Sequence, residues 1–156
     1  MIHAHARAFV TPNRRADRAA SADAAPLLPA AYLRLRREAA GRSIADVAQI
    51  IAAVDPTVNA ALKIDMLTAL VASLEAPGVI ARHPETLVAL RTAFAFDPDV
   101  YRQLATEPAH RHPRICRGCG CSLWDPCTDG DHACAWANDA ACTRCLPGAA
   151  SLACGQ

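Results

Sequence analysis

The stretch PAAYLRLRREAAGRSIADVAQIIA, residues 29–52, predicts two consecutive α-helices. Pro29 opens the first helix and Gly41 closes it, which is the favoured order of helix-start and helix-end residues. Ser43 then stands at the N-cap of a second helix, and Asp46 three residues later completes a pair like that of a capping box. The stretch therefore predicts one helix that ends at Gly41 and another that starts after Ser43.

Both helices carry apolar residues three or four positions apart, the spacing that places them on one face. This pattern predicts which side chains are buried, and it leaves Arg34, Arg37 and Glu38 on other faces of the first helix. The expected buried stripes are Leu28, Ala31, Leu35 and Ala39 in the first helix, and Ile44, Val47, Ala48 and Ile51 in the second.

A repeated start signal predicts three more helices, near residues 57–75, 84–94 and 98–105. Each is preceded by a capping-type residue and a proline, in the pairs Asp55-Pro56, His83-Pro84 and Asp97-Pro98. Proline suits the first helical position because its missing N–H would have no partner there. The larger core groups are expected to be Leu87, Leu90, Phe94, Val100, Tyr101 and Leu104.

Composition supports an all-α fold for residues 27–106. The chain has 156 residues and is 53% apolar, with no long alternating or β-branched run. Residues 1–26 are rich in Ala, Arg, Asp and Ser without helical periodicity, so we expect a disordered basic arm. Residues 1–42 carry a net charge of +5 (eight Arg against three acids), which is a hint of a polyanionic partner.

All eight cysteines lie in the last part of the chain, residues 116–156, after a Pro- and His-rich linker at 107–115. About 40 residues with two tryptophans and little other apolar bulk cannot fold on a hydrophobic core alone. The default compartment is the cytoplasm, where thiols stay reduced, so the cysteines favour metal binding over disulfides.

Two Cys-x2-Cys pairs predict a four-thiolate zinc site, because each pair can bend both sulfurs back onto one ion. The remaining cysteines together with one imidazole would complete a second tetrahedral site; the alternative is that some of them pack as small buried apolar residues. An iron–sulfur cluster is the rival cofactor, since closely spaced cysteines also bind iron. The first site comprises Cys116, Cys119, Cys142 and Cys145; the second comprises Cys121, Cys127, Cys134 and His132. Trp124 and Trp136 are expected to cover the sulfurs, and Cys154 is expected to be a spare.

Residues 30–105 resemble the Xre, or lambda-repressor-like, helix-turn-helix family. The pattern rests on Leu35, Arg36, Arg37, Gly41, Ser43, Val47 and Ala48, and later on Leu87, Leu90, Ala93, Phe94 and Leu104. The resemblance implies a five-helix domain that binds double-stranded DNA, with the third helix in the major groove. The phosphate contacts are expected from Arg34, Arg36, Arg37 and Arg42, with help from Arg14 and Arg15.

The expected third helix is long and mostly apolar, with Lys63 and Asn59 among its few polar positions. Base reading in the major groove favours several Arg, Asn and Gln side chains. Three interpretations therefore stay open for this helix: it reads DNA, it is buried, or it forms a dimer face.

The cysteine-rich part resembles a tail found on small bacteriophage and prophage proteins, with the pattern CR.CGC(T/S)…C…C.W……C..C. The match runs through Cys116, Cys119, Gly120, Cys121, Cys127, Cys134, Trp136, Cys142 and Cys145. It implies a metal-binding module in a phage or bacterial protein.

No nucleophile–base arrangement, phosphate-binding loop or dinucleotide fingerprint is present in the sequence, so we expect neither an enzyme nor a small-molecule substrate. No stretch has the length of a membrane span, so no membrane partner is expected. The leading hypothesis is a DNA-binding regulator with a structural zinc site. The alternatives are a zinc-stabilised adaptor that forms a homodimer or binds a protein partner through its third helix, and an iron–sulfur redox sensor.

Overall fold

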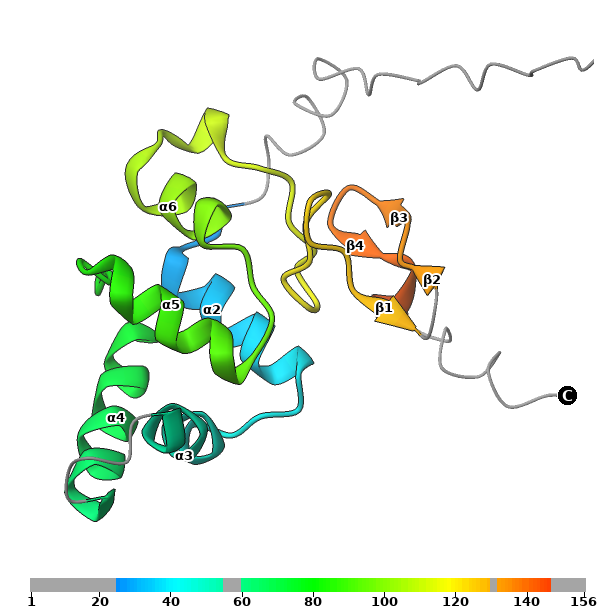
Figure 1. Cartoon of the computed structure of the whole chain (residues 1–156). Coiled ribbons are helices and arrows are strands. Elements are labelled where there is room, and N and C mark those ends of the chain that lie inside the picture. Colours follow the sequence, from blue (N-terminus) through cyan, green and yellow to red (C-terminus); the bar gives the residue numbers. More distant parts are fainter. Residues whose placement is uncertain (1–24, 55–59, 130–131, 147–156) are drawn as a thin grey trace, which may run out of the picture.

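The computed structural model describes residues 25–54, 60–129 and 132–146 (Figure 1). The described part is mainly helical, with a small strand-containing region at its C-terminal end. Its helices are α2 (Pro29–Ala39), α3 (Ile44–Val54), α4 (Ala60–Leu74), α5 (Pro84–Ala93) and α6 (Pro98–Thr106). The predicted disordered arm, with Arg14 and Arg15, lies almost wholly outside the described residues.

The predicted helix signals are present wherever the structure describes them. Pro29 occupies the first turn of α2, and Gly41 has a φ of 65°, the left-handed conformation that glycine adopts without strain. The Ser43 N–H donates to Asp46 Oδ2 at 2.8 Å, and the Asp46 N–H donates to Ser43 Oγ at 3.1 Å. This reciprocal capping box fixes the start of α3. The Asp55-Pro56 signal falls outside the described residues.

The two Pro-led helices that follow differ in their caps. The Asp97 side chain accepts a hydrogen bond from the Asp99 N–H at 2.8 Å and so caps α6. His83 stands at the N-cap of α5 but makes no side-chain cap hydrogen bond. Proline at the first helical position is therefore common to α5 and α6, but of these two helices only α6 has a side-chain cap.

The buried face of α2 differs from the predicted stripe. Leu28 is 49% exposed and Ala39 is exposed, whereas Tyr32 and Leu33 are buried together with Arg36 and Arg37. The prediction allowed only apolar residues inside. Two arginines can be buried here because each guanidinium has a partner from another part of the chain.

The predicted large core residues are confirmed. A single apolar core joins α2, α5 and α6, and part of α3 and α4 packs on it. The Tyr32 hydroxyl accepts a hydrogen bond from the Asp97 N–H at 2.9 Å, and the Tyr101 hydroxyl accepts one from the Ala81 N–H at 2.9 Å. The predicted members of this core are Leu87, Leu90, Phe94, Val100, Tyr101 and Leu104, all at most 6% exposed.

Residues 116–146 form the cysteine module, which contains short antiparallel strands beside the helices (Figure 1). β1 (Thr128–Asp129) pairs with β2 (His132–Ala133), and β3 (Trp136–Asn138) pairs with β4 (Ala141–Cys142). The fold is therefore not purely all-α. The strands were missed because each has only two or three residues, too few for an alternating pattern to appear.

The module is docked on the helical body. The predicted linker forms a short 3-10 helix, η1 (Ala109–Arg111), and then enters the body, where Ile115 is 6% exposed in the apolar core. Arg36 Nη2 of α2 lies 2.7 Å from Asp125 Oδ2 of the module. Gly120 lies so close that a Cβ there would stand 2.9 Å from Arg36 Cδ.

Among the described residues, no helix combines the length and the apolar character that a membrane crossing requires.

Candidate metal centre

The first cysteine turn brings three sulfurs to one place. The Gly120 N–H donates to the Cys116 carbonyl at 2.9 Å, and the Cys116 N–H donates to the Cys121 carbonyl at 2.9 Å. Gly120 has a φ of 74°, which lets the chain reverse sharply after Cys119. As a result, all three cysteines of this turn are buried.

The hairpins bring the other sulfurs to the same place. The Cys134 N–H donates to the Cys127 carbonyl at 2.8 Å beside the β1–β2 pair. Cys142 lies on β4, and its N–H donates to Cys116 Sγ at 3.3 Å. Hydrogen bonds of this kind to sulfur stabilise a thiolate and orient it.

The distances between neighbouring sulfurs suit tetrahedral coordination of a metal ion. Cys142 Sγ lies 3.7 Å from Cys119 Sγ and 3.7 Å from Cys127 Sγ. Cys121 Sγ lies 3.6 Å from Cys134 Sγ. A zinc ion with Zn–S bonds of about 2.3 Å places its ligand sulfurs about 3.8 Å apart, at the edge of a tetrahedron. The sulfur cluster is therefore compatible with metal binding.

The structure groups the sulfurs differently from the prediction. Two groups of four each have all sulfurs within 4.8 Å of one another: Cys116, Cys119, Cys121 and Cys142, and Cys121, Cys127, Cys134 and Cys142. Three of the four residues predicted for each site lie together in one of these groups. Cys121 takes the place predicted for Cys145, and Cys142 takes the place predicted for His132.

His132 lies outside this arrangement, whereas Cys145 packs against it and its thiol interacts with those of Cys119, Cys116 and Cys142. His132 is an exposed residue of β2 and belongs to neither group, so the structure does not bring this predicted ligand to the sulfurs. Cys145 is half-buried beside the first turn, and a Cβ at Gly118 would stand 2.9 Å from its sulfur. Cys154 lies outside the described residues.

The thiols are not equivalent in acidity. A hydrogen bond from the Cys121 thiol lowers the pKa of Cys119 to about 4, and the same bond raises the pKa of Cys121. Burial raises the pKa of Cys127 and of Cys145. The pKa of Cys142 is also lowered, by hydrogen bonds from Cys127 and Cys145 that outweigh its burial, and a lowered thiol pKa favours the thiolate form that binds a metal.

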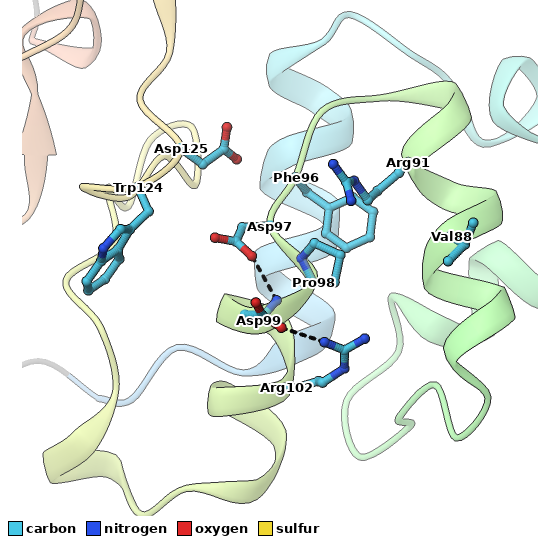
Figure 2. A pocket seen from close by; sticks show the side chains of 9 residues that line it. All are labelled: Val88, Arg91, Phe96, Asp97, Pro98, Asp99, Arg102, Trp124 and Asp125. Atoms are coloured by element: carbon cyan, nitrogen blue, oxygen red, sulfur yellow. Dashed lines mark hydrogen bonds and ion pairs between the residues drawn. The ribbon is translucent and has the colours of Figure 1, made fainter.

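The two tryptophans have different surroundings. Trp136 is half-buried against the sulfur cluster, as predicted, and Arg114 lies over its ring at 4.3 Å from the centroid. Trp124 is 63% exposed and does not cover the cluster. With Asp125 it borders a cleft of about 440 Å³ beside α5 and α6, where Asp97 and Arg102 form the opposite wall (Figure 2).

Two of the arginines expected to contact phosphates already form ion pairs within the chain. Arg36 is 6% exposed, pairs with Asp125 and donates from Nε to the Ala95 carbonyl at 3.0 Å. Arg37 is 8% exposed and donates to both carboxylate oxygens of Glu75, at 2.6 and 2.7 Å. A phosphate contact from either would require these ion pairs to open.

The other arginines expected to contact phosphates are either exposed or outside the described residues. Arg34 and Arg42 have exposed side chains, and Arg14 and Arg15 lie outside the described residues. Asp125 of the cysteine module is the partner of Arg36. Burial raises the pKa of the Asp125 carboxyl, and the positive charge of Arg36 opposes that rise.

Comparison with known proteins yields no relative: no protein-family model matches the chain, and neither the curated proteins nor the solved structures provide a match.

Proposed function

We propose that the chain is a zinc-stabilised interaction protein, in which the cysteine module is a structural zinc centre and α4 is the binding face. The observation that supports the zinc centre is the group of buried sulfurs at tetrahedral spacing, docked on α2. A site closed by four thiolates has no open coordination position for a substrate, which is characteristic of structural zinc. This favours a scaffold role for the metal over a catalytic one.

Zinc fits this spacing better than an iron–sulfur cluster. In a four-iron cluster each thiolate binds a different iron, so the cysteine sulfurs surround a large inorganic core. Here the sulfurs of Cys119, Cys127 and Cys142 lie within 3.7 to 4.0 Å of one another. That arrangement has room for single ions between the sulfurs and none for a cage of iron and sulfide.

Metal content and colour test the zinc centre. Protein purified without oxygen should contain zinc and show no visible absorption. Iron with acid-labile sulfide would instead support the redox-sensor hypothesis. A chain free of both metals, with its thiols still reduced and the module folded, would overturn the metal centre.

The proposed binding face is the outer side of α4. Leu62, Met66 and Leu70 are 58%, 65% and 42% exposed, and they follow one another at four-residue intervals. Side chains at this spacing form one row along a helix. Leu74, at 3% exposed, packs inward and is not part of the row. The third helix is thus neither fully buried nor rich in polar side chains.

The partner we propose for this face is a second copy of the chain. The row is symmetric about Met66, because Leu62 and Leu70 lie one turn before and after it. In an antiparallel pair of α4 helices, Leu62 would face the partner's Leu70, and Met66 would lie on the two-fold axis. A self-complementary surface of this kind is what a two-fold interface requires.

Sedimentation over a range of concentrations tests the pairing. The wild-type chain should form a dimer, and Met66→Glu should be monomeric because it places two like charges on the axis. Val88→Glu is the matched control, since Val88 is 64% exposed and lies on another helix, α5. A wild-type monomer at all concentrations, or a dimer unaffected by Met66→Glu, would contradict the proposal.

DNA binding is the second candidate, favoured by the exposed side chains of Arg34 and Arg42 and by the helix-turn-helix resemblance. It predicts an affinity for duplex DNA that falls steeply as salt is added. Arg34→Ala with Arg42→Ala should weaken that affinity and reduce its salt dependence. Undetectable binding at low salt would eliminate this candidate.

A further inference from the structure

The seven cysteines that the structure describes, within residues 116–145, form one continuous cluster. Two tetrahedral ions bound only by sulfur need eight metal–sulfur bonds. Seven thiolates supply eight bonds when six of them bind one ion each and the seventh binds both ions. A dinuclear site in this cluster would therefore have two sets of three sulfurs with one sulfur between them.

The first set is Cys116, Cys119 and Cys145. The thiols of Cys116 and Cys119 interact with each other, and the Cys145 thiol interacts with both. A Cβ at Gly118 would stand 2.9 Å from Cys145 Sγ and 3.8 Å from Cys116 Sγ. Glycine at this position therefore leaves the space beside both sulfurs open, which lets Cys145 approach the first turn.

The second set is Cys121, Cys127 and Cys134. Cys121 Sγ lies 3.6 Å from Cys134 Sγ, and the thiols of Cys127 and Cys134 interact. Together with Cys142 they form a group whose sulfurs all lie within 4.8 Å of one another. Cys121 is also near the first set. That set has its third sulfur in Cys145, however, whereas the second set would have only two sulfurs without Cys121.

Cys142 lies between the two sets. Its sulfur is 3.7 Å from Cys119 Sγ of the first set and 3.7 Å from Cys127 Sγ of the second. Its thiol also interacts with that of Cys145, and its N–H donates to Cys116 Sγ at 3.3 Å. Cys142 is only 1% exposed, so it is enclosed by the module. It is therefore the sulfur that can complete both sets.

The distance between Cys119 Sγ and Cys127 Sγ, 4.0 Å, decides the number of bridges. Two zinc ions that shared two sulfurs would hold their remaining ligands more than about 5 Å apart. Two ions that share one sulfur lie about 3.8 Å apart, and where one Zn–S bond of each ion runs parallel to the other, the two sulfurs have that same separation. The observed distance therefore fits one shared sulfur and not two.

We propose that the module holds two zinc ions that share the thiolate of Cys142. One ion is completed by Cys116, Cys119 and Cys145, and the other by Cys121, Cys127 and Cys134. This inference rests on the proposed zinc binding and adds the number of ions and the role of each cysteine.

Metal content and cadmium-113 NMR of the wild-type chain test the cluster. Protein purified without oxygen should contain two zinc ions per chain. Cadmium is the NMR probe because it binds thiolates in place of zinc. Two cadmium signals are expected, each split by the other through the shared sulfur. The Cβ protons of Cys142 should correlate with both signals, and those of Cys145 only with the ion bound by Cys116.

The outcomes separate this inference from the proposed function. One zinc per chain would overturn the dinuclear cluster and leave the structural zinc centre intact, whereas no zinc at all would remove both. Two unsplit cadmium signals, with Cys142 on only one ion, would mean separate sites and would overturn the bridge. These results do not depend on the folding of any variant.

Substitutions give an independent test of the ligands. Cys145→Ala should lower the zinc content from two ions to one, because the second set and Cys142 remain. His132→Ala and Cys154→Ala are the matched controls and should keep two, since neither residue belongs to the proposed cluster. Loss of an ion in either control, with two ions kept in Cys145→Ala, would show that the ligands have been assigned wrongly.

Discussion

The helical body and the cysteine module have cores of different chemistry. The body buries large apolar side chains, among them Tyr32, Leu33 and Tyr101, each at most 2% exposed. In the module's cluster, the buried members are cysteines alone, and Trp136 packs against them while only half-buried. Apolar burial can hold the body together by itself. The module lacks that source of stability, so on the proposed zinc binding we expect its fold to depend on metal.

The two regions meet at a small joint. Ile115 carries the chain of the module into the apolar core of the body. Arg36 extends in the other direction, pairing with Asp125 and packing against Gly120. A change in the module can therefore reach the body both through Ile115 and through Arg36 of α2.

Removal of metal should have the largest effect and should act on one region. Structural zinc sites contribute apparent binding free energies of about 10–16 kcal/mol at neutral pH. A strong chelator should therefore unfold the module, which changes the fluorescence of Trp124 and Trp136, while far-ultraviolet circular dichroism retains most of the helical signal. Adding zinc back should restore the fluorescence. A module that keeps its fluorescence and its protection from proteolysis without metal would contradict the comparison.

A substitution in the apolar core should instead destabilise the helical body and leave the module unchanged. Leu33→Ala should lower the free energy of unfolding of the body by about 2–5 kcal/mol, because it leaves a cavity beside Tyr32. Zinc content should not change. Val88→Ala is the matched control: Val88 is 64% exposed and lies outside the proposed binding face, so its effect should stay within about 0.5 kcal/mol. Equal losses from both substitutions in denaturant titrations would show that the core has been placed wrongly.

The body was predictable from the sequence to a greater extent than the module. Prolines at helix starts, the Ser43–Asp46 capping box and the Asp97 cap act within a few residues, so their chemistry is visible in the sequence. The large apolar residues of α5 and α6 likewise follow helical spacing. The buried face of α2 was missed because the partners of Arg36 and Arg37 come from distant parts of the chain, which spacing does not reveal.

The grouping of the cysteines shows a second limit of prediction from the sequence. Cys-x2-Cys spacing identified the region in which the sulfurs cluster. Seven cysteines can be divided into groups of four in many ways, and spacing alone does not select one. The one-residue interval between Cys119 and Cys121 was the available signal, because it places a third sulfur at the first turn. The second Cys-x2-Cys pair favoured Cys145 over Cys121 as the fourth residue of the first predicted site.

A substitution at the joint tests whether the stability of the body depends on the module. Arg36→Met removes one partner of a largely buried ion pair, a change that costs up to about 3–5 kcal/mol where both charges are fully buried. We expect about 2–3 kcal/mol, since the Asp125 side chain is 23% exposed. The melting temperature of the body should then become nearly independent of zinc.

The matched control for the joint is the other buried ion pair. Arg37→Met breaks the contact with Glu75, which lies within the body. It should destabilise the body by a similar amount while leaving the dependence on zinc unchanged. If both variants retained that dependence, the Arg36–Asp125 pair would not be the route between the two regions.

The smallest expected effect is at the capping box of α3, remote from the metal. Ser43→Ala removes the Oγ that accepts from the Asp46 N–H and should cost about 1 kcal/mol. Hydrogen bonds from Ser43 lower the pKa of the Asp46 carboxyl. A carboxyl with a lowered pKa stabilises the fold above its unfolded pKa of about 3.9, and that contribution is lost as the pH falls through the folded value. The stability difference between wild type and Asp46→Asn should therefore shrink toward acid pH. It should do so equally with and without zinc, because this cap belongs entirely to the helical body.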